Sequence, residues 1–443
     1  MREQERKTYW LLALGCDKNI IDAEVMAHRL VSSGYVPVDD PTDADVLIVH
    51  TCGFITPAIE ESVAAVLDAA ECKGPDSTLV VSGCLIQRYS REIGDEIPEI
   101  DLLVGVGRHG EIADLLSSTQ RIAVSDPEAG VYDGTLRIPS TPPYYAFVKI
   151  SEGCDNRCAY CTIPLIRGRQ ISRPANELIQ EIQMLEDGNL FELNLIAQDL
   201  AAYGRDRSGG PDLTDLLEKI MRETTVPWIR LLYLHPASID DRLIQLMAGS
   251  ERLVDYMDMP IQHISDRILT SMGRKLDKKG HRDLISRLRT EIPGLILRTT
   301  VMVGYPGEGE SEFHELLDFI REVRFERLGA FVYSREEGTA AAGMKPVVSE
   351  EEAHRRLDLV METQREISRN HLRGYIGKTL PVLVCGAYTD PGNLYVGRFF
   401  GQAPEIDGQV TFTGDDCELG SLTMVYITDT DDYDVMGYAV DNE

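Results

Sequence analysis

Three cysteines within eight residues constrain this chain more than any other feature. They lie at Cys154, Cys158 and Cys161, with the spacing C-x3-C-x2-C and Tyr160 directly before the last. Thiolates this close in sequence can fold around one small metal cluster, whereas a closed zinc or iron–sulfur site uses four ligands. The sequence shows no obvious fourth ligand nearby. We therefore expect an iron–sulfur cluster with one iron left open to something other than a side chain.

Other uses of such cysteines fit less well. A zinc site would need the missing fourth ligand. A thioredoxin-like C-x-x-C motif belongs in a different fold context. Structural disulfides are rare in the cytoplasm, where we place this chain: its N-terminus does not resemble a signal peptide and no apolar run is long enough to span a membrane.

The first part of the chain alternates between strand and helix patterns, which predicts a parallel sheet with helices on its faces. We expect strands at 9–14, 46–49, 79–82 and 102–106, and helices at 22–33 and 57–70. Cys16, Cys52 and Cys84 each follow one of the first three strands. Because ligands gather at the carboxyl ends of parallel strands, these cysteines predict a second shared cluster. The alternative is three ordinary buried cysteines.

A linker with Gly130, Gly134, Pro139, Pro142 and Pro143 indicates a domain boundary near residue 140. Beyond it, six strand–helix repeats predict an open, partial α/β barrel whose functional face lies at the carboxyl ends of its strands. The expected strands are at 145–150, 192–197, 229–233, 256–259, 296–303 and 328–333, with helices at 176–186, 213–222, 240–247, 266–290 and 311–322.

Polar residues and glycines follow several of these barrel strands. Gln198 and Asp199 follow the second, Gln262 and His263 the fourth, and the stretch from Gly304 to Glu308 the fifth. Gln198, Asp199 and Glu308 are candidates for contacting a cofactor or substrate, and the alternative is ordinary caps and turns. Gly304 would let the backbone approach a cofactor. We expect Tyr160 to pack over the cluster.

A long amphipathic helix at 350–371 is expected to connect the barrel to a different kind of tail. The tail, residues 378–443, has strand patterns and turns at 390–393 and 413–416, which predict a small all-β barrel. It holds twelve acidic residues and two basic ones, Lys378 and Arg398. The whole chain carries a net charge of -29, which argues against strong nucleic-acid binding and suits a basic protein partner.

These motifs resemble one family, the radical-SAM methylthiotransferases, over nearly the whole chain. The Cys154–Cys161 stretch is similar to the radical-SAM signature. The N-terminal cysteines lie in Leu14-Gly-Cys-Asp-Lys-Asn19, Thr51-Cys-Gly-Phe54 and Ser82-Gly-Cys-Leu85. Further resemblance comes from Lys149–Cys154, Arg167-Gly168, Ser172-Arg-Pro174, Ala197-Gln-Asp199, Met259–His263 and Val303–Glu308. The segments Tyr333–Thr339 and Gln402–Gly408 resemble the branch that modifies ribosomal protein twelve of the small subunit.

The resemblance implies a fold, cofactors and partners. The fold would be α/β, with a flavodoxin-like parallel sheet (1–125), a partial (βα)6 radical-SAM barrel (140–372) and a small all-β TRAM barrel (373–443). The cofactors would be S-adenosylmethionine and two 4Fe-4S clusters, one on the N-terminal trio (Cys16, Cys52, Cys84) and one on the barrel trio (Cys154, Cys158, Cys161). No further catalytic side chain is expected. An electron donor such as flavodoxin or ferredoxin is implied, with no membrane, and RNA is not the primary partner expected.

The resemblance also implies a two-part mechanism. One S-adenosylmethionine methylates a sulfur at the open iron of the N-terminal cluster. A second is cleaved at the barrel cluster to a 5′-deoxyadenosyl radical. The radical removes hydrogen from an unactivated carbon of an aspartate, which then receives the methylated sulfur. Such a C–H bond is beyond acid–base chemistry and needs a cofactor radical.

The chain departs from the family pattern at three places. Asp17 stands where Pro is usual, His50 stands where Asn is usual, and Tyr233-Leu-His-Pro236 differs from Tyr-x-Tyr-Pro. None of these changes removes a cysteine. Two other functions stay open: a methylthiotransferase acting on a modified adenosine in tRNA, for which a basic tail is expected, and a non-catalytic iron–sulfur protein for electron transfer.

Overall fold

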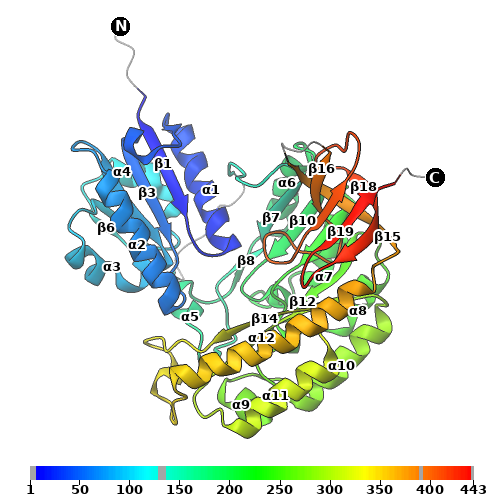
Figure 1. Cartoon of the computed structure of the whole chain (residues 1–443). Coiled ribbons are helices and arrows are strands. Elements are labelled where there is room, and N and C mark those ends of the chain that lie inside the picture. The colour runs from blue at the N-terminus through cyan, green and yellow to red at the C-terminus, as the bar shows by residue number, and fades with distance from the viewer. Residues whose placement is uncertain (1–5, 128–135, 389–392, 441–443) are drawn as a thin grey trace.

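The structure is a computed structural model that describes residues 6–127, 136–388 and 393–440, arranged in three parts (Figure 1). Two parts contain parallel sheets, and the third is a small closed barrel beside the second sheet. Gly130 and Gly134 of the expected linker lie outside the described residues. So do residues 390–392 of the first expected turn in the tail.

The N-terminal part is a parallel sheet of six strands in the order β2-β1-β3-β4-β5-β6. Its strands are β1 (Thr8–Ala13), β2 (Val36–Pro37), β3 (Val46–Thr51), β4 (Thr78–Gly83), β5 (Leu102–Val104) and β6 (Ile122–Ala123). Its helices are α1 (Asp17–Ser32), α2 (Thr56–Cys72), α3 (Cys84–Glu96) and α4 (Ile112–Leu116). Side chains of α1 and α4 pack on one face of the sheet, and those of α2 and α3 on the other. The predicted parallel sheet is confirmed, with β2, β6, α3 and α4 added.

The central part is a second parallel sheet of six strands in the order β14-β13-β12-β11-β10-β7, which confirms the six expected repeats. Its strands are β7 (Tyr145–Lys149), β10 (Glu192–Ile196), β11 (Trp228–Leu231), β12 (Leu253–Asp258), β13 (Ile296–Val303) and β14 (Arg327–Val332). Its helices are α5 (Ile163–Ile166), α6 (Ala175–Glu186), α7 (Leu213–Glu223), α8 (Asp241–Ala248), α9 (Asp266–Ser271), α10 (Lys278–Glu291) and α11 (Glu310–Val323).

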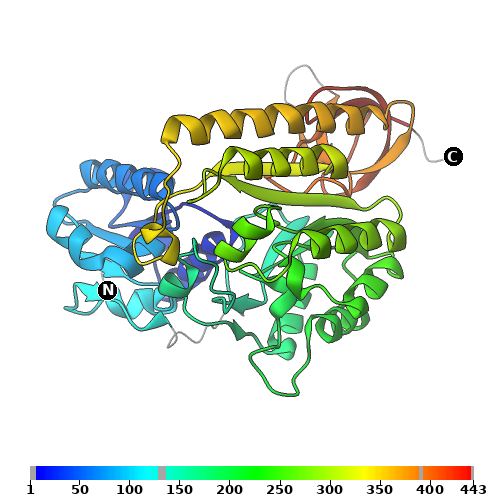
Figure 2. The ribbon, with the colours of Figure 1, turned by 90° about the horizontal axis from the view of Figure 1, so that it is seen from below.

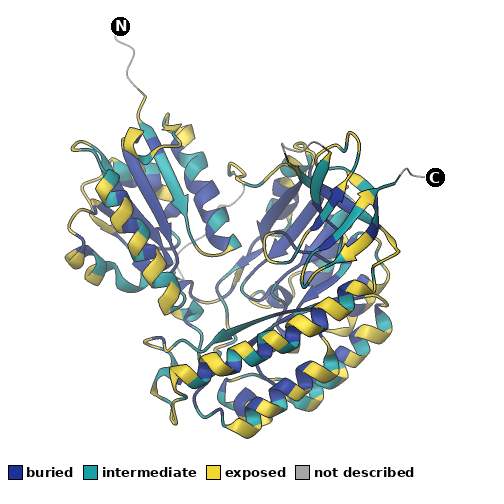
Figure 3. Ribbon diagram, in the orientation of Figure 1, coloured by how far each residue is buried: buried dark blue, intermediate teal, exposed yellow. Residues whose placement is uncertain are grey.

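Most strands of the two parallel sheets are buried, as Figure 3 shows, whereas β1 and β14 are mainly half-buried; the helices that cover the sheets expose one side. β3 reads Val-Leu-Ile-Val-His-Thr and every residue in it is buried. This is the near-continuous apolar run expected of a strand covered on both faces. β11 ends two residues before Tyr233, where the expected strand continued, because the backbone turns to φ +63° at Tyr233.

The long helix α12 (Glu350–Arg373) connects the barrel to the tail, as expected. It runs beside α11 and along β14 to the strands of the tail (Figure 2). Ser349 caps its first turn by accepting a hydrogen bond from the backbone N–H of Glu352.

The tail is a closed five-stranded barrel in the order β15-β16-β17-β19-β18, as expected. Its strands are β15 (Thr379–Ala387), β16 (Leu394–Arg398), β17 (Val410–Thr413), β18 (Leu422–Thr430) and β19 (Val435–Ala439). A buried ion pair fastens this barrel to the central sheet: Glu192 lies 2.6 Å from Arg398 of the tail and 2.7 Å from Arg230 of β11.

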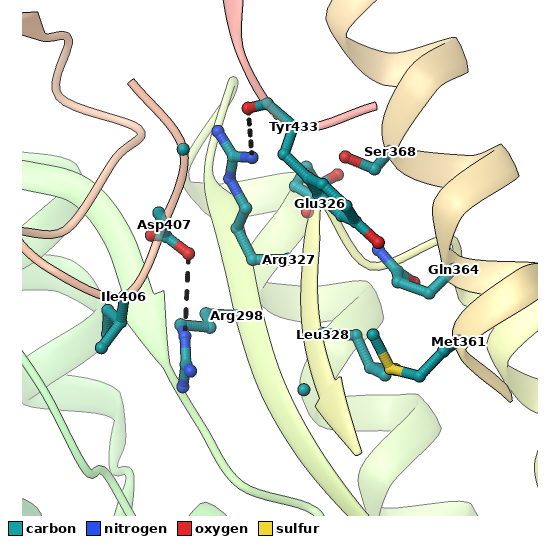
Figure 4. Close-up of a pocket in the computed structure, with 12 residues that line it drawn as sticks. Arg298, Glu326, Arg327, Leu328, Met361, Gln364, Ser368, Ile406, Asp407 and Tyr433 are labelled. Atoms are coloured by element: carbon teal, nitrogen blue, oxygen red, sulfur yellow. Dashed lines mark hydrogen bonds and ion pairs between the residues drawn. The ribbon is translucent and has the colours of Figure 1, made fainter. Parts of the chain in front are cut away.

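A second set of contacts joins the tail to β13 and β14 (Figure 4). Arg298 lies 3.8 Å from Asp407, and Arg327 donates a hydrogen bond of 3.5 Å to the Tyr433 carbonyl. These residues border a cavity of about 340 Å³. No cysteine and none of the expected site residues lines this cavity.

Candidate active site

The N-terminal trio lies at one edge of the first sheet. Cys16 directly precedes α1, Cys52 directly follows β3, and Cys84 is the first residue of α3 after β4. The strands before them, β1, β3 and β4, are neighbours in the sheet. Glycines let the three loops approach one another: a side-chain carbon on Gly15 would lie 2.8 Å from Cys52 Cβ, and one on Gly53 would lie 2.7 Å from the backbone of Leu85.

Asn19 lies at the centre of this edge. Its side-chain N–H donates 2.8 Å to the Leu14 carbonyl and 3.1 Å to the Thr51 carbonyl. It thereby ties the loop of Cys16 to the loop of Cys52. Its Oδ1 lies 3.7 Å from Cys84 Sγ. One buried amide therefore holds all three cysteine loops together.

The barrel trio lies in a loop framed by the short antiparallel pair β8 (Ser151–Glu152) and β9 (Ile171–Ser172). The Cys154 N–H donates 3.1 Å to the Gly168 carbonyl, and the Ala159 N–H donates 2.9 Å to the Met272 carbonyl. Gly153 adopts φ +73°, and a side-chain carbon there would lie 2.1 Å from the Arg169 carbonyl oxygen. Only glycine fits this turn, which opens the loop directly before the first cysteine.

The six cysteines differ in burial: Cys52 and Cys84 are buried, the barrel trio is half-buried, and Cys16 is exposed. Burial raises the pKa of Cys84 to about 12, against the effect of the nearby Arg167 guanidinium, and the Cys16 and Cys52 thiolates raise it further. Burial likewise raises the pKa of Cys161 to about 12 and that of Cys154 to about 11. Buried thiols resist ionisation unless a cation or a metal stabilises the thiolate.

In each trio an arginine donates to a cysteine sulfur. Arg167 Nη2 lies 3.6 Å from Cys84 Sγ, and Arg274 Nη1 lies 3.9 Å from Cys158 Sγ. All six cysteines are free of disulfides. In the described part of the chain, no three Cys, His, Asp or Glu side chains are grouped closely enough to hold a single metal ion. A multi-iron cluster instead spreads its thiolate ligands over several irons.

A group of buried charges connects the two sheets beside the cysteines. We call Asp22, Lys149, Glu152 and Arg167 the interdomain charge cluster. Lys149 lies 2.6 Å from Asp22 and 2.5 Å from Glu152. Arg167 lies 3.0 Å from Asp22 and 2.9 Å from Glu152. Two cations and two carboxylates therefore balance, and the cations lower the pKa of Glu152 to about 2 despite its burial.

Gln198 and Asp199 lie next to the barrel-trio loop. Asp199 accepts hydrogen bonds from the Asn156 side chain at 2.7 Å, from Ser238 Oγ at 3.2 Å and from the His235 N–H at 3.3 Å. It therefore ties the cysteine loop to the turn after β11. Gln198 donates 2.8 Å to Glu152, while its Oε1 is buried without a partner among the described residues. The Oε1 of Gln262 is likewise buried without a partner among the described residues.

Two unpaired amide oxygens at the carboxyl ends of the barrel strands suit a ligand that carries several hydrogen-bond donors. Buried polar groups are normally paired, so unpaired ones indicate a missing partner. S-adenosylmethionine has an ammonium group, an amine and hydroxyls. Its donor groups match the acceptor character of these two oxygens, of which Gln198 was an expected contact and Gln262 was not.

Gly304, Glu308 and Tyr160 have clear neighbours within the protein. Gly304 adopts φ +75°, and a side-chain carbon there would lie 2.6 Å from Ala353 Cβ of α12. Glu308 is buried and lies 2.7 Å from Arg356 of α12. Tyr160 packs with the apolar cluster around Met272 and Tyr305, and burial raises its pKa. Their expected contacts with a cofactor stay predictions.

Our interpretation of the sequence assigned no role to several residues that the structure places at the site. Asn19, Glu152 and Arg167 stood inside the quoted motifs, but nothing in the motifs indicated their partners. Asp22 and Arg274 carried no signal in the sequence. All three departures also lie at the site: the Tyr233 hydroxyl donates 2.9 Å to Asp17, and His50 Nε2 lies 3.9 Å from Asp22.

Three protein families match consecutive parts of the chain. They are the Uncharacterized protein family UPF0004 over residues 8–105, the Radical SAM superfamily over 148–320 and the TRAM domain over 376–440. Curated relatives match nearly the whole chain. A protein of Myxococcus xanthus named Ribosomal protein uS12 methylthiotransferase RimO is 44% identical over 98% of this chain and 92% of its own. The chain belongs to the RimO family.

Other RimO proteins show the same degree of similarity. One of Anaeromyxobacter is 45% identical over 97% of this chain and 93% of its own, and one of Citrifermentans bemidjiense is 42% identical over the full length of both. Family membership makes this chain a radical-SAM methylthiotransferase, as the sequence motifs predicted. Among the helices that the structure describes, none has the length and apolar character that a membrane crossing requires.

Solved structures support the fold of this RimO-family chain. The radical S-adenosylmethionine methyltransferase TsrM from Kitasatospora setae superposes with a TM-score of 0.56 at 14% identity, over 74% of this chain and 73% of its own. The cobalamin-dependent S-adenosylmethionine radical enzyme OxsB gives a TM-score of 0.52 at 11% identity, over 81% of this chain and 56% of its own. Both likenesses concern the fold alone.

Proposed function

We propose that this chain attaches a methylthio group to the β-carbon of an aspartate in ribosomal protein uS12. The observation that supports this proposal most strongly is a sequence identity of 42–45%, over at least 96% of the chain, to relatives named uS12 methylthiotransferases. The two cysteine trios at the carboxyl ends of two parallel sheets support it, because the reaction needs both a radical and a sulfur donor.

The proposal assigns one 4Fe-4S cluster to each trio and S-adenosylmethionine to the carboxyl ends of the barrel strands. The N-terminal trio would hold its cluster through Cys16, Cys52 and Cys84, and the barrel trio through Cys154, Cys158 and Cys161. Gln198, Asp199, Gly304, Glu308 and Tyr160 would border the cofactor. When bound, these groups supply the radical chemistry and the methylated sulfur that no side chain provides.

The protein's own residues hold the parts in place and keep water out. Asp199 fixes the barrel-trio loop through Asn156, and Asn19 fixes the loops of the N-terminal trio. The interdomain charge cluster joins the two sites across the domain boundary. Apolar residues Met272, Tyr305 and Ile268 pack beside Tyr160 and keep solvent from that side of the loop.

The proposal also covers partners, location and domain bounds. The substrate would be uS12, free or within the ribosome, and the electron donor a flavodoxin or ferredoxin, all in the cytoplasm. The net charge of -29 favours a basic protein over nucleic acid. The domains are taken as 1–125, 140–372 and 373–443, and each family match falls inside one of them.

The test offers the reconstituted enzyme both candidate substrates. Purified protein, dithionite, sulfide and S-adenosylmethionine are incubated with uS12 or with tRNA, and the products are analysed by mass spectrometry. We expect uS12 to gain the mass of one sulfur and one CH2 at a single aspartate. A methylthio group on tRNA with none on uS12 would support the adenosine-modifying function instead. If Cys154→Ala still cleaved S-adenosylmethionine, the radical assignment would be wrong.

A further inference from the structure

Arg167 belongs to the barrel domain but contacts a cysteine of the N-terminal domain. It ends the short helix α5, which packs against α3 at the junction of the two domains (Figure 1). Its Nη2 lies 3.6 Å from Cys84 Sγ and 2.6 Å from Asn19 Oδ1. Its Nη1 lies 2.9 Å from Glu152, two residues before Cys154. One guanidinium therefore connects a ligand of one trio to the loop of the other.

We propose that Arg167 is a positioning residue that stabilises the reduced form of the N-terminal cluster. It would do so by donating an N–H to the Cys84 thiolate across the domain boundary. The proposal rests on the proposed function, since it requires that the N-terminal trio hold a cluster. It goes further by assigning control of that cluster to the other domain.

The physical reason lies in the charge of the cluster. Reduction adds one electron, from dithionite in the experiment below, and makes the cluster and its thiolates more negative. Hydrogen bonds to the sulfurs and the local charge set the reduction potential of such clusters. A guanidinium N–H stabilises the more negative form, and burial strengthens this effect because little water screens it. Arg167 is only 3% exposed.

Two other cations near Arg167 pair with carboxylates. The Lys149 ammonium is engaged by the carboxylates of Asp22 and Glu152. Arg169 lies two residues beyond Arg167 in the same loop, but its side chain is 69% exposed and pairs with Asp155. Arg167 differs from both in donating to Cys84 Sγ at 3.6 Å.

The experiment isolates the N-terminal cluster in the full-length chain. In a background with Cys154→Ala, Cys158→Ala and Cys161→Ala, only the N-terminal trio remains to bind iron and sulfide. The ratio of reduced to oxidised cluster is followed by electron paramagnetic resonance during titration with dithionite. We expect Arg167→Gln to lower this ratio about tenfold at a fixed potential, because a hydrogen bond to a charged group contributes about 1.5 kcal/mol or more. A tenfold change corresponds to about 59 mV for one electron.

Two further variants separate the hydrogen bond from its surroundings. Arg167→Gln leaves the interdomain charge cluster with two carboxylates and one cation. Adding Asp22→Asn restores the charge balance, because one cation (Lys149) then faces one carboxylate (Glu152). If Arg167→Gln alone fails to fold, this double variant is the one that tests the proposal. Arg169→Gln is the matched control, since it removes the same charge from the same loop without touching a cysteine. We expect the double variant to show the same lowered ratio of reduced to oxidised cluster as Arg167→Gln. We expect Arg169→Gln to show the same ratio as the background without it.

Specific results would overturn the proposal. An unchanged ratio in the double variant would show that the Cys84 contact does not affect the cluster. An equal fall in Arg169→Gln would show that only overall charge matters. If the background itself bound no cluster, the second cluster of the proposed function would be wrong along with this inference. A normal cluster with an unchanged ratio would overturn the inference alone.

Discussion

His263 is a buried histidine whose ring must stay neutral in the folded protein. Its Nδ1 accepts the backbone N–H groups of Ile264 at 2.9 Å and Ser265 at 3.0 Å. Burial lowers its pKa from 6.5 to about 3. The unfolded chain therefore binds a proton below pH 6.5 that the folded chain rejects until about pH 3. Its contribution to stability is complete above pH 6.5 and is lost as the pH falls through this window.

His263→Asn should remove the part of the pH dependence of stability that comes from this ring. At pH 5 the histidine should cost the wild-type chain about 2 kcal/mol relative to pH 7.5, since one pKa unit corresponds to about 1.4 kcal/mol. Urea unfolding of both proteins at the two pH values measures the difference. His314→Asn is the control, because it removes a histidine that is exposed rather than buried. Equal slopes for His263→Asn and wild type would contradict the assignment.

The sequence predicted the cysteines at the site better than their neighbours. Cys16, Cys52 and Cys84 could be grouped because each follows a strand and parallel strands end at one edge. The contact between Arg167 and Cys84 spans 83 residues and crosses a domain boundary. It depends on how two domains pack, which no local spacing encodes. The same limit applies to Asp22, whose partners Lys149 and Arg167 are both in the other domain.

At the scale of elements, the buried strands were predictable and the short or interrupted elements were not. β3 begins with four apolar residues in a row, and β13 has apolar residues at both ends, on either side of Arg298, Thr299 and Thr300. β2 and β6 have two residues each and leave no pattern. α3 was missed because it begins at Cys84 itself and is interrupted at Tyr89, where φ is -131°. Helical periodicity cannot be followed across such a break.

Substitution of Gly304 tests how closely the end of β13 packs against α12. It shares a left-handed backbone with Gly294, but a side chain on Gly294 would meet nothing within 4 Å, whereas one on Gly304 would meet Ala353 at 2.6 Å. Gly294→Ala should cost about 1 kcal/mol from backbone conformation alone. Gly304→Ala should cost about 2 kcal/mol more from overpacking. Urea unfolding measures both.

The double variant Gly304→Ala with Ala353→Gly distinguishes helix packing from contact with a cofactor. Removing the Ala353 methyl group makes room for the new one, so we expect the crowding part of the loss to be recovered. Equal costs at Gly294 and Gly304 would contradict the packing explanation. If the double variant recovered the stability lost to crowding but did not bind S-adenosylmethionine, Gly304 would also be needed for binding the cofactor.

At the scale of the whole molecule, the small barrel is joined to the central sheet through buried charge. Glu192 is fully buried between Arg230 and Arg398, and the Tyr145 and Tyr256 hydroxyls donate to Glu405 and Asp407 across the same boundary. An acidic tail thus contributes one of its two basic residues to the interface. We infer that the tail has a structural role in addition to any contact with substrate.

Arg398→Leu should destabilise the chain by about 3 kcal/mol, because it removes one of the two partners of a buried carboxylate. It should also speed proteolysis near the start of β15, where the tail begins. Lys378→Leu is the matched control: it removes the other basic residue of the tail, whose ammonium lies over the Tyr375 ring at 5.6 Å. If both variants lost the same stability, the interface charge would not be what holds the tail.

The central claim is that two separate cysteine trios each hold a cluster, and iron content tests it most directly. The reconstituted chain is compared with a variant carrying Cys16→Ala, Cys52→Ala and Cys84→Ala, with one carrying Cys154→Ala, Cys158→Ala and Cys161→Ala, and with Cys72→Ala as control. We expect each triple variant to keep half of the iron and sulfide, and Cys72→Ala to keep all of it. Full iron content in either triple variant would contradict the claim, and so would complete loss in both.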